Sequence, residues 1–310
     1  MDRGSIRLAY LILAHRLPRQ LLWLLEAIYD PRDIFLIHVD LKSLLGLKAH
    51  RQGVWQAARR FAEGRPNVRL MRPRLTNWGG WSLTRLQLDA ISELLDADPD
   101  WTHFINISGQ CYPIRPLSEI RAALADAGGQ VFVEMEPFSL DSPEEPGWHE
   151  RWMIELPHRA IKLPWKRRSP TSFRLAHKGS QWCILPRAFC EWQRHAPVRR
   201  RITRFLRHGM ISDELIFQAL VDNGPYRERV APHPAWEVVF PGPKVMTEAD
   251  LPMLRASPAF FARKFDESAD RAVLVALSQH IGARALPPSA VAAAGAAEIS
   301  VREPERQGTA

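Results

Sequence analysis

Polar and ionisable residues follow several apolar runs of this 310-residue chain, at the points where buried strands are predicted to end. In an open α/β sheet, ligands bind beyond the carboxyl ends of the strands, so these residues are the first candidates for a functional site. They are His15 and Arg16, then Asp40, Trp78 nearby, Ser108-Gly109-Gln110, and Glu134 with Glu136. Asp40 can accept hydrogen bonds from a ribose or a base, or it can cap the helix that follows. Both interpretations of Asp40 stay open at this level.

The sequence lacks the glycine-rich loops that hold phosphates in kinases and dehydrogenases. It contains neither G-x-x-x-x-G-K-[ST] nor G-x-G-x-x-G after a strand. Two overlapping D-x-D triplets occur at Asp96, Asp98 and Asp100, but they precede a predicted strand, which favours a solvated turn at the wrong end of the sheet. The segment Ser108-Gly109-Gln110 at the right end offers poor ligands for a hard cation. We therefore predict no metal site and no cofactor.

Short apolar runs alternate with helical patterns through the first half of the chain. Strands are predicted at 8–14, 34–40, 68–71, 102–108 and 130–135, with helices at about 19–29, 43–63 and 82–95. This alternation is typical of a mostly parallel sheet that helices cover on both faces, an α/β fold. The pattern weakens from 137 to 170 and predicts long loops there. A strand at 179–186 and a helix at 212–221 follow, and both are expected on one edge of the same sheet.

The composition is that of an ordinary globular protein, with 46% hydrophobic and 25% charged residues. No apolar run approaches the ~20 residues of a membrane-spanning helix, and the N-terminus lacks a signal-peptide cleavage site. No repeat or linker divides the chain, so we predict one domain over 1–286 and a disordered Ala- and Pro-rich tail over 287–310. Three cysteines, Cys111, Cys183 and Cys190, cannot all pair with one another, which favours a reducing compartment, the cytoplasm.

The net charge of +8 is concentrated in one part of the chain. Residues 162–207 contain 13 Lys and Arg but one acidic residue, Glu191. Such a segment can be a solvated basic face, or it can bind a phosphorylated ligand, an anionic membrane or a nucleic acid. No nucleic-acid motif accompanies the charge, so we expect no nucleic-acid partner. Peripheral contact with anionic lipid at the inner face of the membrane is the expected use.

Seven segments, in order, resemble the core-2/I-branching β-1,6-N-acetylglucosaminyltransferases and the related peptide O-xylosyltransferases. They are AYLILAHR (9–16), IFLIHVD (34–40), NWGGWSLTRLQLD (77–89), FINISGQCYPIRP (104–116), GSQWCILPRAF (179–189), SDELIF (212–217) and FFARKFD (260–266). The resemblance implies a GT-A-like, Rossmann-like catalytic domain. It also implies inverting transfer of a sugar, N-acetylglucosamine or else xylose, from a UDP-sugar to a glycan or polysaccharide-precursor acceptor, without a divalent metal.

Inverting transfer is one in-line displacement that needs a base for the acceptor hydroxyl and positive charge for the departing diphosphate. The resemblance implies Glu214 as the base, although Ser followed by acidic residues is also the usual start of a helix. It implies Lys264 as the main diphosphate ligand. Lys244 is the expected second cation, with Arg263 in reserve, because the family's upstream arginine has no clear counterpart here. An exposed loop lysine is an equally good interpretation of Lys244.

The resemblance also implies which residues meet the two ends of the reaction. His15, Arg16, Asp40 and Trp78 are expected at the nucleoside end of the donor. Acceptor binding is expected from Glu134 or Glu136, from Arg151, and from Trp182 and Trp236 as flat walls for a sugar ring, although packing in the core is the ordinary role of a tryptophan. The alternative function is a non-catalytic nucleotide-sugar or glycan binder on the same fold.

Overall fold

The computed structural model describes residues 6–45, 52–142, 149–157, 159–232, 235–240 and 242–283. Its central sheet has the strand order β10-β4-β1-β2-β3. The strands are β1 (Leu8–Ala14), β2 (Ile34–Val39), β3 (Val68–Leu70), β4 (His103–Ser108) and β10 (Ile184–Pro186). β1 is parallel to β2 and β4, and β2 is parallel to β3, whereas β10 is antiparallel to β4. The predicted α/β class with a mostly parallel sheet is confirmed. The predicted tail at 287–310 lies outside the described residues.

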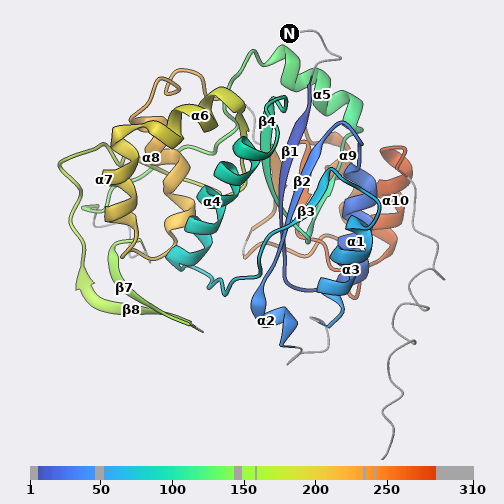
Figure 1. Cartoon of the computed structure of the whole chain (residues 1–310), viewed down its shortest axis with the longest axis horizontal. Coiled ribbons are helices and arrows are strands. Elements are labelled where there is room, and N and C mark those ends of the chain that lie inside the picture. Colours follow the sequence, from blue (N-terminus) through green and yellow to red (C-terminus); the bar gives the residue numbers. More distant parts are fainter. Residues whose placement is uncertain are drawn as a thin grey trace, which may run out of the picture.

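Helices cover both faces of this sheet (Figure 1). The helices α4 (Trp81–Ala97) and α6 (Arg187–His195) lie on one side, and α1 (Pro18–Ile28) and α3 (Val54–Ala62) lie on the other. Every residue of β1, β2 and β4 is buried, which explains why these strands have no alternation of polar and apolar residues along most of their length. The other helices are α2 (Leu41–Leu44), α5 (Leu117–Asp126), α7 (Pro197–Leu206), α8 (Ile216–Asp222), α9 (Leu251–Ala256) and α10 (Ala272–His280), with 3-10 turns η3 (Ser212–Glu214) and η4 (Glu248–Asp250).

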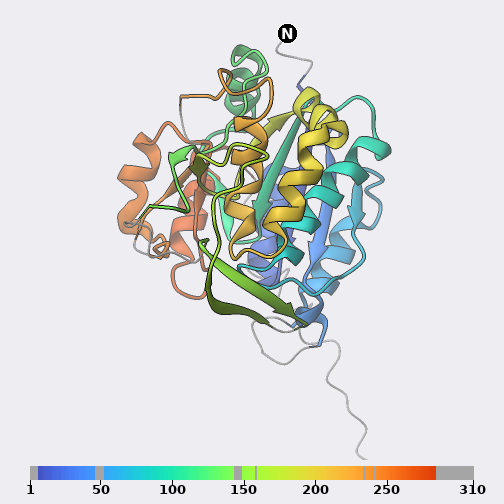
Figure 2. The same cartoon turned by 90° about the vertical axis from the view of Figure 1, so that its left-hand side faces the viewer.

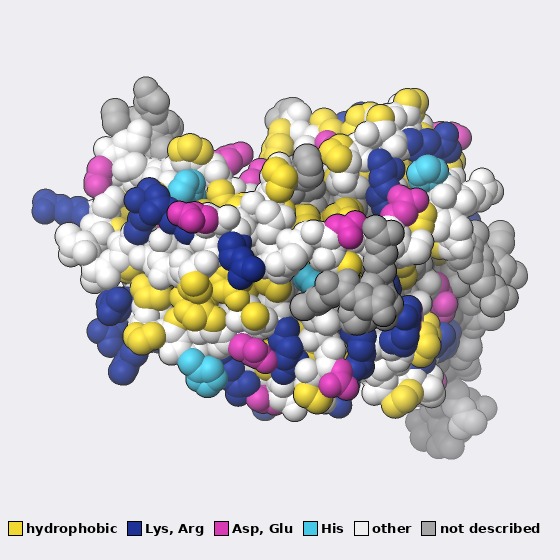
Figure 3. Space-filling view, turned by 90° about the horizontal axis from the view of Figure 1, so that it is seen from above, with side chains coloured by type: hydrophobic (Ala, Val, Ile, Leu, Met, Phe, Trp, Pro, Cys, Tyr) yellow, Lys and Arg dark blue, Asp and Glu magenta, His cyan; other side chains and the backbone are white. Residues whose placement is uncertain are grey.

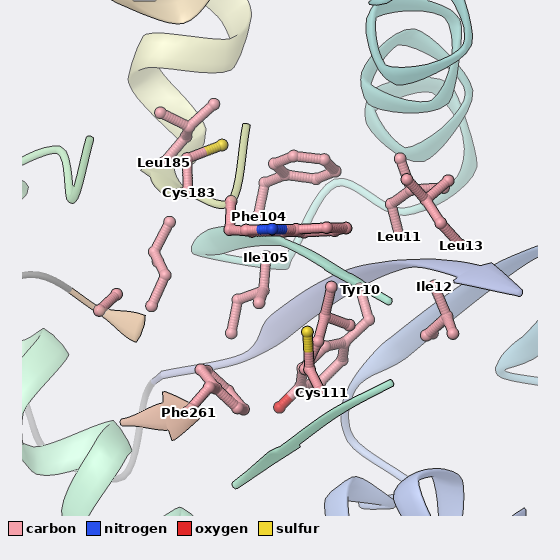
Figure 4. Packing of buried hydrophobic residues seen from close by; sticks show 14 of the residues in the cluster. Tyr10, Leu11, Ile12, Leu13, Phe104, Ile105, Cys111, Cys183, Leu185 and Phe261 are labelled. Atoms are coloured by element: carbon pink, nitrogen blue, oxygen red, sulfur yellow. The ribbon is translucent and has the colours of Figure 1, made fainter. Parts of the chain in front are cut away.

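A second, three-stranded sheet continues from the end of β4. It has the order β11-β12-β5, formed by β11 (Trp236–Val238), β12 (Phe261–Arg263) and β5 (Cys111–Pro113). Figure 4 shows Ile105 of β4, Cys111 of β5, Leu185 of β10 and Phe261 of β12 in one apolar core, and all four are fully buried. The three cysteines are buried and free. This packing fixes the C-terminal part of the chain against the carboxyl end of β4.

The predicted strand at 130–135 is wrong. Val131 and Phe132 are buried, as the apolar run indicated, but they form isolated bridges to Val230 and Ile184. Because these two partners come from different segments, no continuous ladder forms. The regular pairing nearby is β6 (Glu136–Pro137) with β9 (His177–Lys178).

The predicted long loop at 137–170 is also wrong, because it contains an antiparallel hairpin of β7 (Arg151–Leu156) and β8 (Arg159–Lys166). The hairpin lies at the end of the molecule where β1, β2 and β4 reach their carboxyl ends (Figures 1 and 2). Along β7, the buried Met153 is preceded by Trp152 and followed by Ile154, and both of these apolar side chains are exposed. This strand therefore lacks the alternation of polar and apolar residues that identifies a half-buried strand.

Two predicted helices begin or end at other residues. Within 43–63, α2 ends at Leu44 and α3 begins at Val54, while 46–51 lie outside the described residues. The helix expected at 212–221 begins as the 3-10 turn η3, and α8 starts at Ile216. Among the described residues, no helix combines the length and apolar character needed to cross a membrane.

Candidate functional site

The carboxyl ends of β1 and β4 are joined to the segment that follows β12. Arg16, just beyond β1, forms an ion pair with Asp266, with 2.7 Å between Nη2 and Oδ2. The amide of Phe265 donates to the carbonyl of Gln110, which follows β4, over 2.9 Å. These contacts bring Lys264 and Asp266 to the edge of the sheet where α/β proteins bind their ligands.

The cations expected at the diphosphate lie on neighbouring backbone. The amide of Lys264 donates to the carbonyl of Lys244 over 3.3 Å. The Lys244 ammonium is already paired with Asp250, 2.5 Å from Oδ1, and the Arg263 guanidinium stacks on the ring of Trp182 at 4.6 Å. No carboxylate in the described part of the chain lies within ion-pair distance of the Lys264 ammonium. Lys264 is therefore the cation of these three best able to bind a phosphate.

The pKa of Asp266 reflects the charges at this edge of the sheet. Burial alone would raise the pKa of Asp266, but hydrogen bonds from Ser268 and the charges of Arg16 and Lys264 lower it overall. Asp266 is consequently an anion near neutral pH. Because two cations face one carboxylate, the edge keeps an excess of positive charge.

Glu214 ends the 3-10 turn η3, which packing contacts hold in place. The amide of Ile211 donates to the carbonyl of Gly79 over 2.9 Å, and the hydroxyls of Thr84 and Ser212 hydrogen-bond over 2.7 Å. Ser212 therefore does not cap the turn through its side chain, contrary to the helix-start interpretation of this motif. The Glu214 side chain is 43% exposed, so its carboxylate is open to a substrate.

Three glutamates expected in acceptor chemistry are close neighbours. Burial raises the pKa of Glu134, the amide of Ser180 opposes that rise by donating over 2.8 Å, and the charges of Glu136 and Glu214 raise the pKa further. The preceding amide, of Gly179, donates to the carbonyl of Glu214 over 3.0 Å. The dipeptide 179–180 thus connects Glu134 to Glu214, which are 80 residues apart in the sequence.

The residues expected at the nucleoside end have different environments. Asp40 is buried, and its Oδ1 accepts from the amide of Lys42 over 2.8 Å, so it caps α2. Its Oδ2 accepts from both the amide and the hydroxyl of Thr76. His15 and Trp78 are exposed. The capping role of Asp40 is therefore observed, while contact of these residues with a nucleotide stays a prediction.

The two tryptophans expected to wall the acceptor are both buried. Trp182 lies under Arg263, and Trp236 stacks on Phe261 with 5.1 Å between ring centroids. Arg151 begins the β7–β8 hairpin, where its Nε lies 3.2 Å from Glu150. Packing accounts for most of both tryptophan surfaces, and their contact with a sugar stays a prediction.

Two functional candidates have no signal in the sequence. His149 is 9% exposed, packs edge-on against the ring of Phe138, and places Nε2 3.4 Å from Oε2 of Glu214, within ion-pair distance but not aligned as a hydrogen bond. Asp213 is fully enclosed, with no hydrogen-bond partner at Oδ1. Burial, and then the charge of Glu214, raise the pKa of Asp213 to about 7. His149 is 65 residues from Glu214 in the sequence, so only the folded chain brings the two together.

The D-x-D aspartates lie at the amino end of β4, as predicted. Asp96 pairs with Arg194 at 2.6 Å, and Asp98 pairs with Arg7 at 2.8 Å. Within the described ranges, no group of three or more His, Cys, Asp and Glu side chains is arranged to hold a metal ion. Metal independence of the reaction itself stays a prediction.

A groove of about 560 Å³ lies between the β7–β8 hairpin and the start of α4. It is lined by Leu75, Asn77, Trp81, Ser82, residues 153–157, Arg207 and His208. None of the predicted donor or acceptor residues belongs to this lining. The groove is therefore not the predicted donor or acceptor site.

Comparison with known proteins identifies relatives over most of the chain. A family model described as Branch: Core-2/I-Branching enzyme matches residues 8–233. Xylosyltransferase 2 of Canis lupus familiaris and of Homo sapiens are each 28% identical over 309 residues, covering 91% of this chain and 34% of each relative. Xylosyltransferase 1 of Pan troglodytes is 29% identical over 231 residues, covering 73% of this chain and 23% of that protein. The chain thus spans about a third or less of these relatives' length.

Proposed function

Because the chain belongs to the Core-2/I-Branching enzyme family, we propose that it is a glycosyltransferase that moves a sugar from a UDP-sugar to a hydroxyl of a glycan or peptide acceptor. The transfer inverts the anomeric centre and needs no divalent metal. The names of the xylosyltransferase relatives support xylose as one donor sugar to test, beside the N-acetylglucosamine expected from the sequence.

The observation that carries this proposal is a continuous series of contacts from the base to the cations. The backbone carbonyl of Glu214 accepts a hydrogen bond from the amide of Gly179. The next residue, Ser180, accepts from the amide of Trp182 over 3.2 Å, and Trp182 lies under Arg263. Arg263 precedes Lys264 in the chain. Glu214 and Lys264 are therefore held on one connected piece of structure, which supports the proposal that they act on the same substrate.

The chemistry follows from these two groups. The acceptor oxygen forms a bond to the anomeric carbon while the bond from that carbon to the UDP oxygen breaks, and the acceptor proton passes to Glu214. Negative charge develops on the departing diphosphate, which Lys264 neutralises, with Lys244 and Arg263 beside it. Glu136 and Glu214 both lie close enough to Glu134 for their charges to raise its pKa, so Glu134 and Glu136 are suited to accept hydrogen bonds from the other hydroxyls of a sugar acceptor.

The test separates binding from chemistry. Glu214→Gln should lower turnover by about 10²- to 10⁴-fold, the usual contribution of a general base, and leave UDP affinity unchanged. Lys264→Ala should weaken UDP binding, and both effects should persist in EDTA. The matched control is Glu191→Gln, an exposed glutamate on α6 paired with Arg187. Full turnover in Glu214→Gln would show that Glu214 is not the base. Unchanged UDP affinity in Lys264→Ala would show that Lys264 does not contact the diphosphate.

The second candidate is a nucleotide-sugar or glycan binder that has lost transfer. Slow UDP release from a UDP-sugar without acceptor separates the two, because only a competent site hydrolyses the donor. The exposure of Glu214 favours the enzyme, as does the absence of an ion-pair partner within 4.0 Å of the Lys264 ammonium among the described residues.

The location proposed for the enzyme is the cytoplasmic face of an anionic membrane. Part of the basic segment 162–207 is engaged internally, since Arg167 and Arg199 are largely enclosed and Arg194 pairs with Asp96. Exposed arginines on α7, among them Arg200 and Arg201, support the electrostatic part of this contact.

A further inference from the structure

The β7–β8 hairpin carries an unusual concentration of exposed apolar side chains. Among the described residues, eight large hydrophobic side chains are exposed, and four of them belong to this hairpin: Trp152 (42%), Ile154 (50%), Leu156 (39%) and Trp165 (65%). Single exposed apolar residues are common, but a cluster on one element marks an interaction surface. We call these four residues the hairpin apolar face.

The register of the hairpin forces this face outward. Ile154 lies opposite Ile161, and side chains opposite each other point to the same side of a sheet. The alternate residues point inward, where Met153 packs with Met210 and Ile211. Glu155, also inward, accepts a hydrogen bond from the amide of Ser82 over 2.9 Å. Burying the apolar face would require a one-residue slip that exposes Met153 and breaks the Glu155 contact.

Basic side chains surround this face. Arg159, which lies opposite Leu156, and Arg168 are exposed on or next to the hairpin, and exposed Arg207 lines the adjoining groove together with Ile154 and Leu156. No acidic residue occurs from 156 to 190. The opposite end of the molecule instead mixes Lys and Arg with Asp and Glu (Figure 3). A surface that is apolar at its centre and cationic at its rim is complementary to the headgroups and upper acyl region of an anionic bilayer.

The hairpin is also placed where membrane contact would matter for catalysis. It lies at the end of the molecule where the parallel strands reach their carboxyl ends (Figures 1 and 2). Its first strand begins two residues after His149, whose Nε2 is 3.4 Å from Glu214. A protein docked through the hairpin would hold Glu214 near the bilayer surface, close to an acceptor carried by the membrane.

We propose that the β7–β8 hairpin docks the protein peripherally on an anionic lipid bilayer, with Trp152 and Trp165 in the interface and Arg159, Arg168 and Arg207 at the headgroups. This inference rests on the membrane location proposed above and names the surface responsible. It does not depend on the role of Glu214.

The experiment is sedimentation of the full chain with vesicles of phosphatidylcholine alone or mixed with phosphatidylglycerol. Wild type should sediment with the anionic vesicles, less so in high salt. Trp152→Ser combined with Trp165→Ser should lower the vesicle partition coefficient by about tenfold or more, which corresponds to about 1.4 kcal/mol. Phe240→Ser is the matched control, because Phe240 is 72% exposed outside the hairpin, and it should bind as wild type does. Trp152 also packs against His208 and Arg167, so the unfolding temperature of the double variant is measured beside its binding. Trp165→Ser alone, at a side chain that is 65% exposed, should weaken binding and leave the unfolding temperature unchanged.

Three other results would overturn the inference. Full binding by the double variant would show that the hairpin is not the docking surface. If Arg200→Gln with Arg201→Gln then abolished binding, α7 would be the membrane-binding element instead. If wild type bound to neither kind of vesicle, the proposed membrane location of the enzyme would be refuted as well. A wild-type dimer that the tryptophan substitutions convert to a monomer, without vesicle binding, would show that a second copy of the chain covers this face.

Discussion

Asp213 allows a quantitative test of the environment next to the proposed base. Its pKa lies at about 7 because burial, and secondarily the charge of Glu214, disfavour the carboxylate. The pKa is raised on folding, so the folded chain holds a proton that the unfolded chain, with a pKa near 3.8, releases. The stability gained from this proton is complete below about pH 4 and is lost as the pH rises through about 7.

The size of the effect follows from the same values. At about pH 5 the folded-state pKa is about two units above the pH, and each unit corresponds to about 1.4 kcal/mol. The wild-type free energy of unfolding should therefore fall by about 3 kcal/mol between about pH 5 and pH 9 through Asp213 alone. Asp213→Asn stays neutral throughout and removes this component.

The measurement is urea unfolding of wild type and Asp213→Asn at both pH values. The stability of the variant relative to wild type should rise by about 3 kcal/mol from about pH 5 to pH 9. Asp141→Asn, at an exposed aspartate, should show no such dependence. The reasoning is refuted if the difference between Asp213→Asn and wild type is equal at the two pH values or falls with increasing pH.

Two further predictions concern the surroundings of Glu214. His149→Gln should lower turnover by about tenfold, or about 1.4 kcal/mol in activation free energy, because its Nε2 is 3.4 Å from Glu214. The substitution should also alter the acid side of the pH–rate profile and leave UDP affinity unchanged. An unchanged profile would show that His149 is a packing residue only. Gly179→Ala should destabilise the protein by about 1–3 kcal/mol, since its Cβ would lie 2.2 Å from the carbonyl oxygen of Glu134. Gly109→Ala, whose Cβ would make only ordinary contacts from 3.7 Å outward, is the control in thermal unfolding, and equal stability of the two variants would contradict the predicted clash.

Sequence patterns predicted the central sheet well because its strands are buried on both faces. The runs at 8–14, 34–40 and 102–108 are apolar over most of their length, and the structure has β1, β2 and β4 there. The hairpin escaped prediction for the opposite reason. One of its faces packs on the body, and its solvent face is apolar too, so the usual contrast between faces is missing.

The order of strands along the chain determined which residues stand at the carboxyl edge, since parallel strands separated by helices end on the same side. His15, Arg16, Asp40 and Gln110 could therefore be named from the sequence. Tertiary structure decided what these residues touch. Arg16 pairs with Asp266, 250 residues away, and Asp40 is occupied by Thr76 and the start of α2.

The sequence by itself determined the α/β class, the parallel strands and, through its ordered motifs, the family. The first two follow from local apolar patterns, and the third follows from seven short segments that resemble the family in the same order. Only the tertiary structure decided that His149 adjoins Glu214, that Asp213 is buried, that Trp182 lies beneath Arg263, and that four apolar side chains of the hairpin face outward. These contacts depend on how distant segments pack and on strand register, and neither has a local signature because a side chain's neighbours are set by the whole fold.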